Sequence, residues 1–175
     1  HRTPRVLLLQ GPVGPFFRHL QDELNGNGFD AWRVTFNAGD RFYAGRHKTV
    51  NFSERPSRYA TWLRNFLLDG KFSLVVLFGC ARPIHDIARS VCRKMGVPVL
   101  SLEEGYVRPG FVTMEEEGNC AASPLAGRLP RLDEEFRSAP IRSNQTRSSF
   151  VPMGRYAAVY YLVHGLFSGR VERRF

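Results

Sequence analysis

The chain has 175 residues, of which 43% are hydrophobic and 13% aromatic, and it carries a formal net charge of +9. This composition excludes a disordered chain, and the length suits one domain of ordinary size with a buried core. Most of the positive charge comes from arginines scattered along the whole chain. Such a balance favours anionic partners, such as phosphate-bearing substrates, lipid headgroups or nucleic acid, although an arginine-rich surface without a specific ligand explains it equally well.

The cysteines and the apolar segments indicate the cellular compartment in which the protein works. Cys80, Cys92 and Cys120 are odd in number and lack the paired short spacing of a zinc site or a redox dithiol, which favours a reduced, cytoplasmic setting. The N-terminal apolar run is only as long as a strand, so we expect no secretory signal. The apolar stretch 156–167 is interrupted by His164 and is too short to span a bilayer. We therefore expect a protein that is soluble, or at most peripheral at a membrane.

Hydrophobic periodicity predicts alternating strands and helices up to residue 102. In chain order the pattern predicts a strand at 5–10, a helix at 15–25, a strand at 29–36, a long polar loop, a helix at 56–68, a strand at 73–78, a helix at 83–95 and a strand at 97–102. This order predicts an α/β fold, a Rossmann-like parallel sheet with helices on both faces. Gly28, Gly70 and Gly96 follow the helical stretches, where C-caps belong.

The regular pattern fades after Pro109. Residues 110–114 predict one more short strand, and 115–119 predict a solvated turn. The stretch 123–149 is rich in proline, arginine and serine and is typical of a linker, and 153–167 predicts an amphipathic helix. We therefore expect a Rossmann-like domain at 1–130, followed at 131–175 by a linker and a helix that packs on the sheet or on an absent partner.

The loop after the first strand has two alternative interpretations. Gly11 and Gly14 permit close approach to a phosphate, and a helix N-terminus follows them. Their spacing differs from the dinucleotide-binding fingerprint, and Pro12 and Pro15 lack the amide donors of a phosphate cradle, so a stiff structural turn explains the loop as well. In a sugar site, Gln10 would supply both a donor and an acceptor to hydroxyl groups.

Two carboxylates follow the last predicted parallel strand. Glu103 and Glu104 are adjacent, so in an extended segment they point to opposite sides and do not form a dyad. One of them can act as a general acid or base in a cleft, with Arg108 holding an anionic substrate group. A structural alternative is that one glutamate caps the loop and pairs with Arg108.

Two further loops are expected at the same edge of the sheet. Arg82 and His85 lie at the start of a helix after the third strand, where the positive end of the helix dipole attracts anions. Asn37 and Asp40 follow the second strand and can hydrogen-bond sugar hydroxyls, although polar turn residues explain the same pattern. The common placement of the four loops, more than any single motif, indicates a site.

Four ordered segments carry a family resemblance: 10–17, 36–40, 78–83 and 103–109. Together they resemble the capsular polysaccharide biosynthesis and export family, the bacterial β-Kdo (3-deoxy-manno-octulosonic acid) transferases, over roughly residues 5–130. The resemblance implies a retaining glycosyltransferase of the GT-B kind, in which two Rossmann-like halves enclose a cleft. It also implies CMP-Kdo as the donor substrate, bound mainly in the C-terminal half.

The His-Pro motif and the Gln- and Asp-containing motif of that family's second half are absent from the sequence. The chain therefore resembles an N-terminal half that carries the acceptor side and is inactive alone, and the resemblance implies a cytoplasmic location, at most peripheral at the inner membrane. Implied partners are the CMP-sugar donor, an anionic glycolipid acceptor, the missing C-terminal domain, and capsule assembly and export proteins. The expected catalytic residue is Glu104, and the expected substrate-binding residues are Gln10, Gly11, Gly14, Asn37, Asp40, Arg82, Glu103, Tyr106 and Arg108.

No cofactor is expected, and no metal, because the sequence has no acidic metal cluster. The alternative function is a non-catalytic Rossmann-like module that binds a phosphorylated ligand or a partner. A nucleic-acid partner is not expected, because the chain has neither a nucleic-acid-binding motif nor a clustered basic face.

Overall fold

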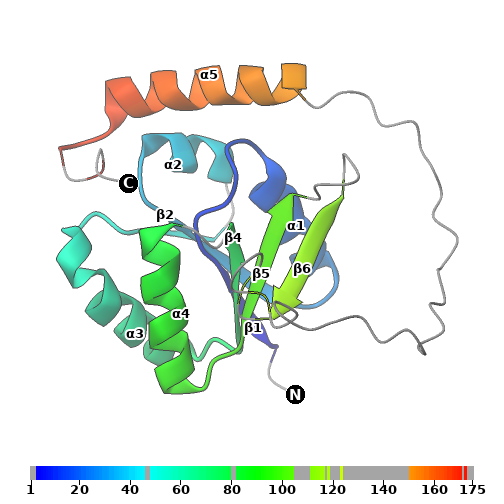
Figure 1. Cartoon of the computed structure of the whole chain (residues 1–175), viewed down its shortest axis with the longest axis vertical. Coiled ribbons are helices and arrows are strands. Elements are labelled where there is room, and N and C mark those ends of the chain that lie inside the picture. Colours follow the sequence, from blue (N-terminus) through cyan, green and yellow to red (C-terminus); the bar gives the residue numbers. More distant parts are fainter. Residues whose placement is uncertain are drawn as a thin grey trace, which may run out of the picture.

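The computed structural model describes residues 3–45, 48–79, 82–104, 111–116, 118, 123, 150–170 and 172. Its strands are β1 (Arg5–Leu8), β2 (Asp30–Thr35), β3 (Thr49–Asn51), β4 (Leu74–Phe78), β5 (Val99–Glu104) and β6 (Val112–Glu116). Its helices are α1 (Phe16–Gly26), α2 (Ala38–Ala44), the short 3-10 helix η1 (Pro56–Arg58), α3 (Tyr59–Gly70), α4 (Pro83–Met95) and α5 (Phe150–Phe167) (Figure 1).

The six strands form one sheet in the order β3-β2-β1-β4-β5-β6. Strands β1 to β5 pair in parallel, and β6 runs antiparallel to β5, with Leu102 opposite Met114. The predicted α/β fold with a Rossmann-like parallel sheet is thus confirmed, with the difference that the edge strand β6 runs antiparallel. The chain moves outward from β1 to β3 and then returns to β4 on the other side of β1. That reversal makes the carboxyl ends of β1 and β4 the topological switch point, where sheets of this kind bind ligands.

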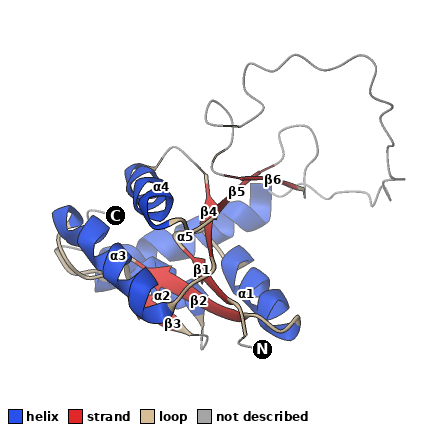
Figure 2. Cartoon of the chain, turned by 90° about the horizontal axis from the view of Figure 1, so that it is seen from below, coloured by secondary structure: helices blue, strands red, loops and turns tan. Residues whose placement is uncertain are grey.

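Alternating side chains of β1 and of Leu9, which follows it, bury both faces of the sheet. Leu7 and Leu9 belong to a core with α3 and α4, whereas Val6 and Leu8 belong to a second core with α1. Because successive side chains of a strand point to opposite faces, one apolar run supplies both cores. Figure 2 shows α1 and α3 on opposite sides of the strands.

The predicted long polar loop between the second strand and the next helix is wrong, because it contains α2 and β3. Asn37 caps α2 by accepting a hydrogen bond of 2.9 Å from the backbone N–H of Asp40. β3 pairs with β2, with Val50 opposite Val34. Both elements are too short to produce a readable period in the sequence.

Two smaller expectations also need correction. Glu115 and Glu116 belong to β6 rather than to a turn, so this edge strand carries charges that discourage pairing with other chains. Gly96 caps α4 with a φ of 68°, as expected. At Gly70 the cap prediction is wrong: Lys71 takes the left-handed conformation, with a φ of 51°, and Gly70 stays helical. A Cβ on Gly70 would lie 2.2 Å from the ring of Phe72, so packing requires the glycine.

α5 packs on α2 and lies across the carboxyl edge of the sheet, as Figure 1 shows at the top of the molecule. The predicted helix therefore folds back on its own domain. Within the described residues, no helix has both the length and the apolar character needed to cross a bilayer.

Candidate functional site: a pocket at the switch point

The loop after β1 begins the site. The backbone N–H of Leu9 donates to the carbonyl of Val76 over 2.9 Å, so β1 and β4 stay paired up to this loop. A Cβ on Gly11 would lie 2.6 Å from the ring of Phe17, which allows only glycine there. Gly14 has a φ of +114°, a conformation that other residues rarely adopt. Both glycines thus have structural roles, as the stiff-turn interpretation requires.

The start of α4 forms the second side of the site. Arg82 is the N-cap residue of α4, and its side chain reaches across the switch point, where Nη1 donates to the carbonyl of Gly11 over 3.2 Å. The loops after β1 and β4 are therefore joined directly. The remaining guanidinium donors lie next to a helix N-terminus, where partial positive charge adds to that of Arg82.

α5 forms the third side, and a buried polar network holds it in place. The hydroxyl of Tyr160 accepts a hydrogen bond of 2.8 Å from Asn37 Nδ2 and donates one of 3.2 Å to Asp40 Oδ1. The other carboxylate oxygen of Asp40 accepts from the backbone N–H of Phe36 over 3.0 Å. Asn37, Asp40 and Tyr160 are all buried. Their polar atoms satisfy one another, which makes docking of α5 specific to one arrangement.

A second contact fixes the end of α5. The backbone N–H of Ala38 donates to Ser168 Oγ over 3.1 Å, and Ser168 Oγ lies 2.8 Å from His164 Nδ1. The rings of His164 and Tyr160 stack, with centroids 6.2 Å apart and planes 15° apart. These contacts orient the imidazole along the inner side of α5.

The three sides enclose a pocket of about 430 Å³. Its lining residues are Gln10, Gly11, Val13, Pro56, Arg82, Pro83, Ile84, Ile87, Tyr160, Tyr161 and His164. This lining set contains an amide, a guanidinium and an imidazole, contains no carboxylate, and is otherwise mostly apolar and aromatic. A pocket of this size and character suits a small ligand with an anionic or hydroxylated end and an apolar part.

Burial changes the protonation equilibria around the pocket. Burial raises the pKa of the Asp40 carboxyl, although hydrogen bonding from Phe36 and the positive charge of Arg33 oppose this effect. Burial likewise lowers the pKa of Arg33, which is opposed by the charge of Asp40. Burial lowers the pKa of His85 to about 4, so its imidazole is neutral at pH 7. Its Nδ1 lies 2.5 Å from the carbonyl of Gly79 and in the neutral ring donates to it.

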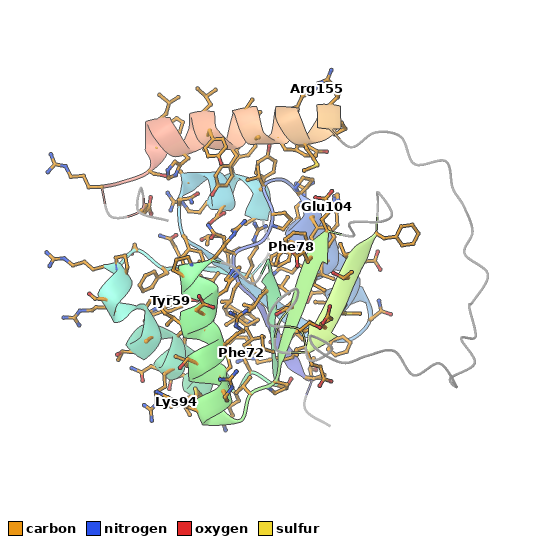
Figure 3. All side chains as sticks on the ribbon, in the orientation of Figure 1. Tyr59, Phe72, Phe78, Lys94, Glu104 and Arg155 are labelled. Atoms are coloured by element: carbon orange, nitrogen blue, oxygen red, sulfur yellow. The ribbon has the colours of Figure 1, made fainter. Side chains whose placement is uncertain are left out.

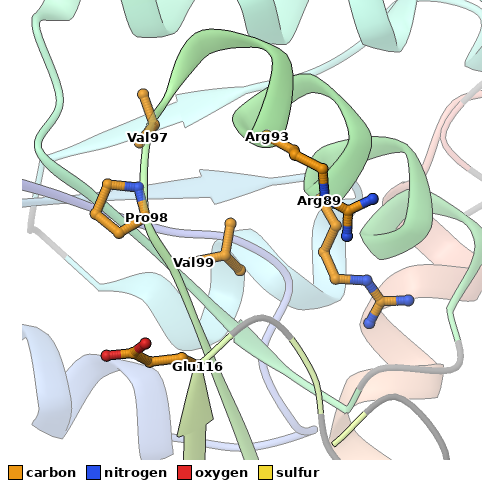
Figure 4. Close-up of a pocket in the computed structure, with 6 residues that line it drawn as sticks. All are labelled: Arg89, Arg93, Val97, Pro98, Val99 and Glu116. Atoms are coloured by element: carbon orange, nitrogen blue, oxygen red, sulfur yellow. The ribbon is translucent and has the colours of Figure 1, made fainter. Parts of the chain in front are cut away.

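A second hollow lies at the other end of the sheet, near the start of β5. Figure 4 shows Arg89 and Arg93 reaching toward it from α4, with Glu116 on the opposite side. It holds only about 150 Å³, and it is far from the carboxyl ends of the parallel strands. Both its size and its position make it a poorer candidate than the switch-point pocket.

The structure brings three of the predicted site residues together, since Gln10, Gly11 and Arg82 all line the pocket. Asn37 and Asp40 instead lie under α5 and bond to Tyr160.

The other predicted site residues lie outside the pocket lining. Gly14 lies next to Tyr156, where an added Cβ would be 3.0 Å from the tyrosine ring. Glu103 is half-buried and Glu104 exposed at the carboxyl end of β5, where Figure 3 labels Glu104. Tyr106 and Arg108 lie outside the described residues. Substrate contacts of these residues stay predictions.

The contribution of α5 to the site was not predicted from the sequence. Tyr156, Tyr160 and His164 are spaced four residues apart, which places them on one side of a helix. This spacing could have shown that the two tyrosines and the histidine share the side of the helix that packs on the domain. Within the described ranges, no group of three or more His, Cys, Asp or Glu side chains is placed to hold a metal ion.

Comparisons with known proteins give the family. The family model described as a capsule polysaccharide biosynthesis protein matches residues 73–172. The capsule polysaccharide export protein KpsS of Escherichia coli is 38% identical over 136 residues, covering 78% of this chain and 34% of that protein. The capsule polysaccharide modification proteins LipB of Neisseria meningitidis serogroups A and B are 34% identical over 166 residues, covering 90% of this chain and 39% of theirs. The chain thus spans less than two fifths of the length of these relatives, and it belongs to the family of capsule polysaccharide biosynthesis proteins.

Proposed function

We propose that this chain is the acceptor-side half of a capsule glycosyltransferase that moves Kdo from CMP-Kdo to a lipid or to a Kdo-terminated acceptor. The pocket at the switch point carries this proposal, because doubly wound sheets bind ligands at that position. The names of the relatives, which refer to capsule polysaccharide export and modification, support a capsule glycan as the acceptor class.

The side chains of the pocket match such an acceptor. A guanidinium such as that of Arg82 binds a carboxylate or phosphate by charge-assisted hydrogen bonds. Gln10 offers both a donor and an acceptor to sugar hydroxyls, and the imidazole of His164 offers a further polar group. Ile84 and Ile87 supply apolar surface for the carbon skeleton of a sugar or the start of a lipid chain.

The reaction needs groups that this pocket does not contain. Glu104 lies at the same edge of the sheet, at the carboxyl end of β5, and is exposed rather than pocket-lining. In this proposal Glu104 acts as the acid or base, or orients the acceptor, once a second half carrying the donor closes over the edge. The chain alone is therefore expected to bind acceptor but not to transfer Kdo.

The test is a calorimetric titration of the 175-residue chain with a water-soluble Kdo-phosphoglycerol headgroup and, separately, with CMP. We expect saturable binding of the headgroup and none of CMP. Replacement Arg82→Gln should weaken headgroup binding by roughly tenfold or more, the value of one charge-assisted hydrogen bond. Arg93→Gln is the matched control, because Arg93 lies on the same helix but lines the hollow at the opposite end of the sheet.

Each outcome separates two interpretations. Saturable CMP binding that Arg82→Gln weakens would place the donor in this half and overturn the acceptor-side assignment. If neither probe binds, the proposal fails and the non-catalytic module remains. Equal loss in Arg82→Gln and Arg93→Gln would show that binding depends on overall charge and not on the pocket.

A further inference from the structure

His164 is a polar side chain that α5 contributes to the switch-point pocket. Its ring lines the pocket together with Arg82, which is the N-cap residue of α4. A neutral imidazole carries one proton, on either Nδ1 or Nε2. The position of that proton decides whether the nitrogen that meets a ligand donates or accepts a hydrogen bond, so the contacts of His164 determine what the pocket can bind.

The imidazole of His164 is held in one orientation. Its Nδ1 lies 2.8 Å from Ser168 Oγ, and the backbone N–H of Ser168 donates to the carbonyl of His164 over 3.1 Å. The ring also stacks on that of Tyr160, whose hydroxyl bonds to Asn37 and Asp40. Because Nδ1 is engaged with Ser168, Nε2 is the ring nitrogen that can meet a ligand in the pocket.

The hydroxyl of Ser168 links this ring to α2. Ser168 is buried, and its Oγ accepts a hydrogen bond of 3.1 Å from the backbone N–H of Ala38. That amide only donates, so it uses a lone pair of the hydroxyl oxygen, whereas an unprotonated Nδ1 accepts the hydroxyl proton. We propose that Ser168 donates to Nδ1 of His164 and keeps the proton of the neutral ring on Nε2, from which it is donated to an oxyanion of the ligand.

The position of the proton limits the chemistry of the pocket. With the proton on Nε2, His164 and Arg82 both donate, one from α5 and the other from α4. Two such donors suit oxygens that only accept, which are those of the carboxylate of an acidic sugar or of the phosphate of a headgroup. No lone pair of His164 then meets the ligand, so His164 does not act as the base that deprotonates an acceptor hydroxyl. Only the ligand contact rests on the proposed function.

The proton is located by NMR on the ligand-free chain. Long-range ¹H–¹⁵N correlation spectra distinguish a protonated from an unprotonated ring nitrogen, at pH 8, where imidazoles are mostly neutral. The chain has five histidines, and His164→Gln identifies the signals of His164. We expect a protonated Nε2 and an unprotonated Nδ1. A proton on Nδ1 would overturn the proposal, because His164 would then donate to Ser168 and present a lone pair to the pocket.

The ligand contact is tested by calorimetric titration of the chain with Kdo, with glycerol phosphate and with glucose. Kdo carries a carboxylate and no phosphate, and glycerol phosphate the reverse, so the two probes distinguish the sources of the oxyanion. We expect at least one of them to bind, and glucose to bind more weakly by roughly tenfold or more. Failure of both anions to bind, or equal binding of glucose, would overturn the ligand contact.

Two replacements of His164 separate donation from other roles. His164→Leu should weaken binding of the anion by roughly tenfold, the value of one charge-assisted hydrogen bond. His164→Gln should weaken it by about threefold at most, because its amide N–H takes the place of the Nε2 donor. In a protein of the relatives' full length, a donor role predicts the same order for transfer rates, whereas a base role predicts equal loss, since neither side chain takes up a proton. Equal losses would overturn the proposal.

Ser168 acts through His164 and is therefore a positioning residue. Ser168→Ala should weaken binding of the anion by roughly threefold or more, and Ser168→Thr, which keeps the hydroxyl, should restore it. Ser90→Ala is the matched control, at an exposed position of α4. Circular dichroism of each variant shows whether it folds. A folded Ser168→Ala with native affinity would overturn the positioning role.

The two proposals fail in different ways. If the proton lies on Nε2 but no acceptor headgroup binds, the proposed function fails and takes the ligand contact with it, while the assignment of the proton stands. If the headgroup binds and the proton lies on Nδ1, the acceptor-side assignment stands and the role of the Ser168–His164 pair is overturned.

Discussion

The amide of Asn37 donates a hydrogen bond of 2.8 Å to the hydroxyl of Tyr160, and both side chains are buried. Asn37 caps α2 with its amide oxygen while its amide nitrogen holds α5, so one side chain joins two helices. The wall of the switch-point pocket formed by α5 therefore depends on how α2 begins.

We expect Tyr160→Phe to lower the free energy of unfolding by about 1–3 kcal/mol, because it leaves the polar atoms of Asn37 and Asp40 buried without their partner. Urea denaturation measures the loss, and hydrogen exchange should show faster exchange in α5. Tyr161→Phe is the control, since Tyr161 is 63% exposed, and it should change stability by less than about 0.5 kcal/mol. Equal stability of the two variants would contradict a structural role for the Tyr160 hydroxyl.

Gly39→Ala should also weaken docking of α5, for a steric reason. A Cβ at Gly39 would lie 2.6 Å from the ring of Tyr160, so the helix must shift, at a cost of roughly 1–3 kcal/mol. Gly154→Ala is the matched control within α5, because nothing lies within 4 Å of its added Cβ. There, alanine should stabilise the helix by about 0.5–1 kcal/mol. Thermal unfolding should therefore show a lower stability for Gly39→Ala and a higher stability for Gly154→Ala. A Gly39→Ala variant that is more stable than the native chain would show that α5 is not held against α2.

The stability of the protein should fall as the pH drops from 6.5 toward 4, in part because of His85. Burial lowers the pKa of His85 from 6.5 to about 4, and the charges of Arg82 and Arg89 act in the same direction, opposed by hydrogen bonding to Gly79. In this window the unfolded chain binds the proton that the folded protein excludes. Protonation therefore favours unfolding, by up to about 1.4 kcal/mol per pH unit.

The measurement for His85 is the slope of unfolding free energy against pH in the native chain and in His85→Gln. Between pH 4 and 6.5, the slope of unfolding free energy against pH should be smaller in the variant by an amount that corresponds to at most one proton. This difference in slope does not depend on the absolute stability of the variant. His19→Gln, at an exposed position of α1, is the control for replacing a histidine. An unchanged slope in His85→Gln would show that His85 does not exclude the proton.

Under the proposed function, Glu104→Gln in a protein of the relatives' full length should lower the rate of Kdo transfer by about 10²–10⁴-fold, the range that general acid–base groups supply. Acceptor affinity should change much less. Glu116→Gln is the control, because this exposed glutamate lies opposite Leu100, at the other end of the β5–β6 pair. Native turnover in Glu104→Gln would exclude Glu104 as the acid or base.

The parallel sheet could be predicted because its strands and helices are long and periodic. Residues 5–10 and 73–78 read as buried strands, and β1 and β4 lie within them. Elements that depend on tertiary contacts show a weaker hydrophobic pattern in the sequence. α2 and β3 hold only 7 and 3 residues, and β6 forms by pairing with β5.

The candidate site was predictable only in part, for a related reason. Gln10 and Arg82 lie in the loops that follow β1 and β4, so the rule that ligands bind at the carboxyl edge predicted that they share a pocket. Asn37 and Asp40 obey the same rule, but α5 covers them and takes their hydrogen bonds. When a helix from a distant part of the chain packs on a site, the local sequence of the residues it covers does not indicate that they are covered.

The contact between Asn37 and Tyr160 joins residues that are 123 positions apart. The entropy of closing so long a loop grows only with the logarithm of its length, and doubling the length costs about 0.6 kcal/mol. The buried contacts of Asn37 and Asp40 with Tyr160 therefore hold the pocket wall in register across this long separation in the chain.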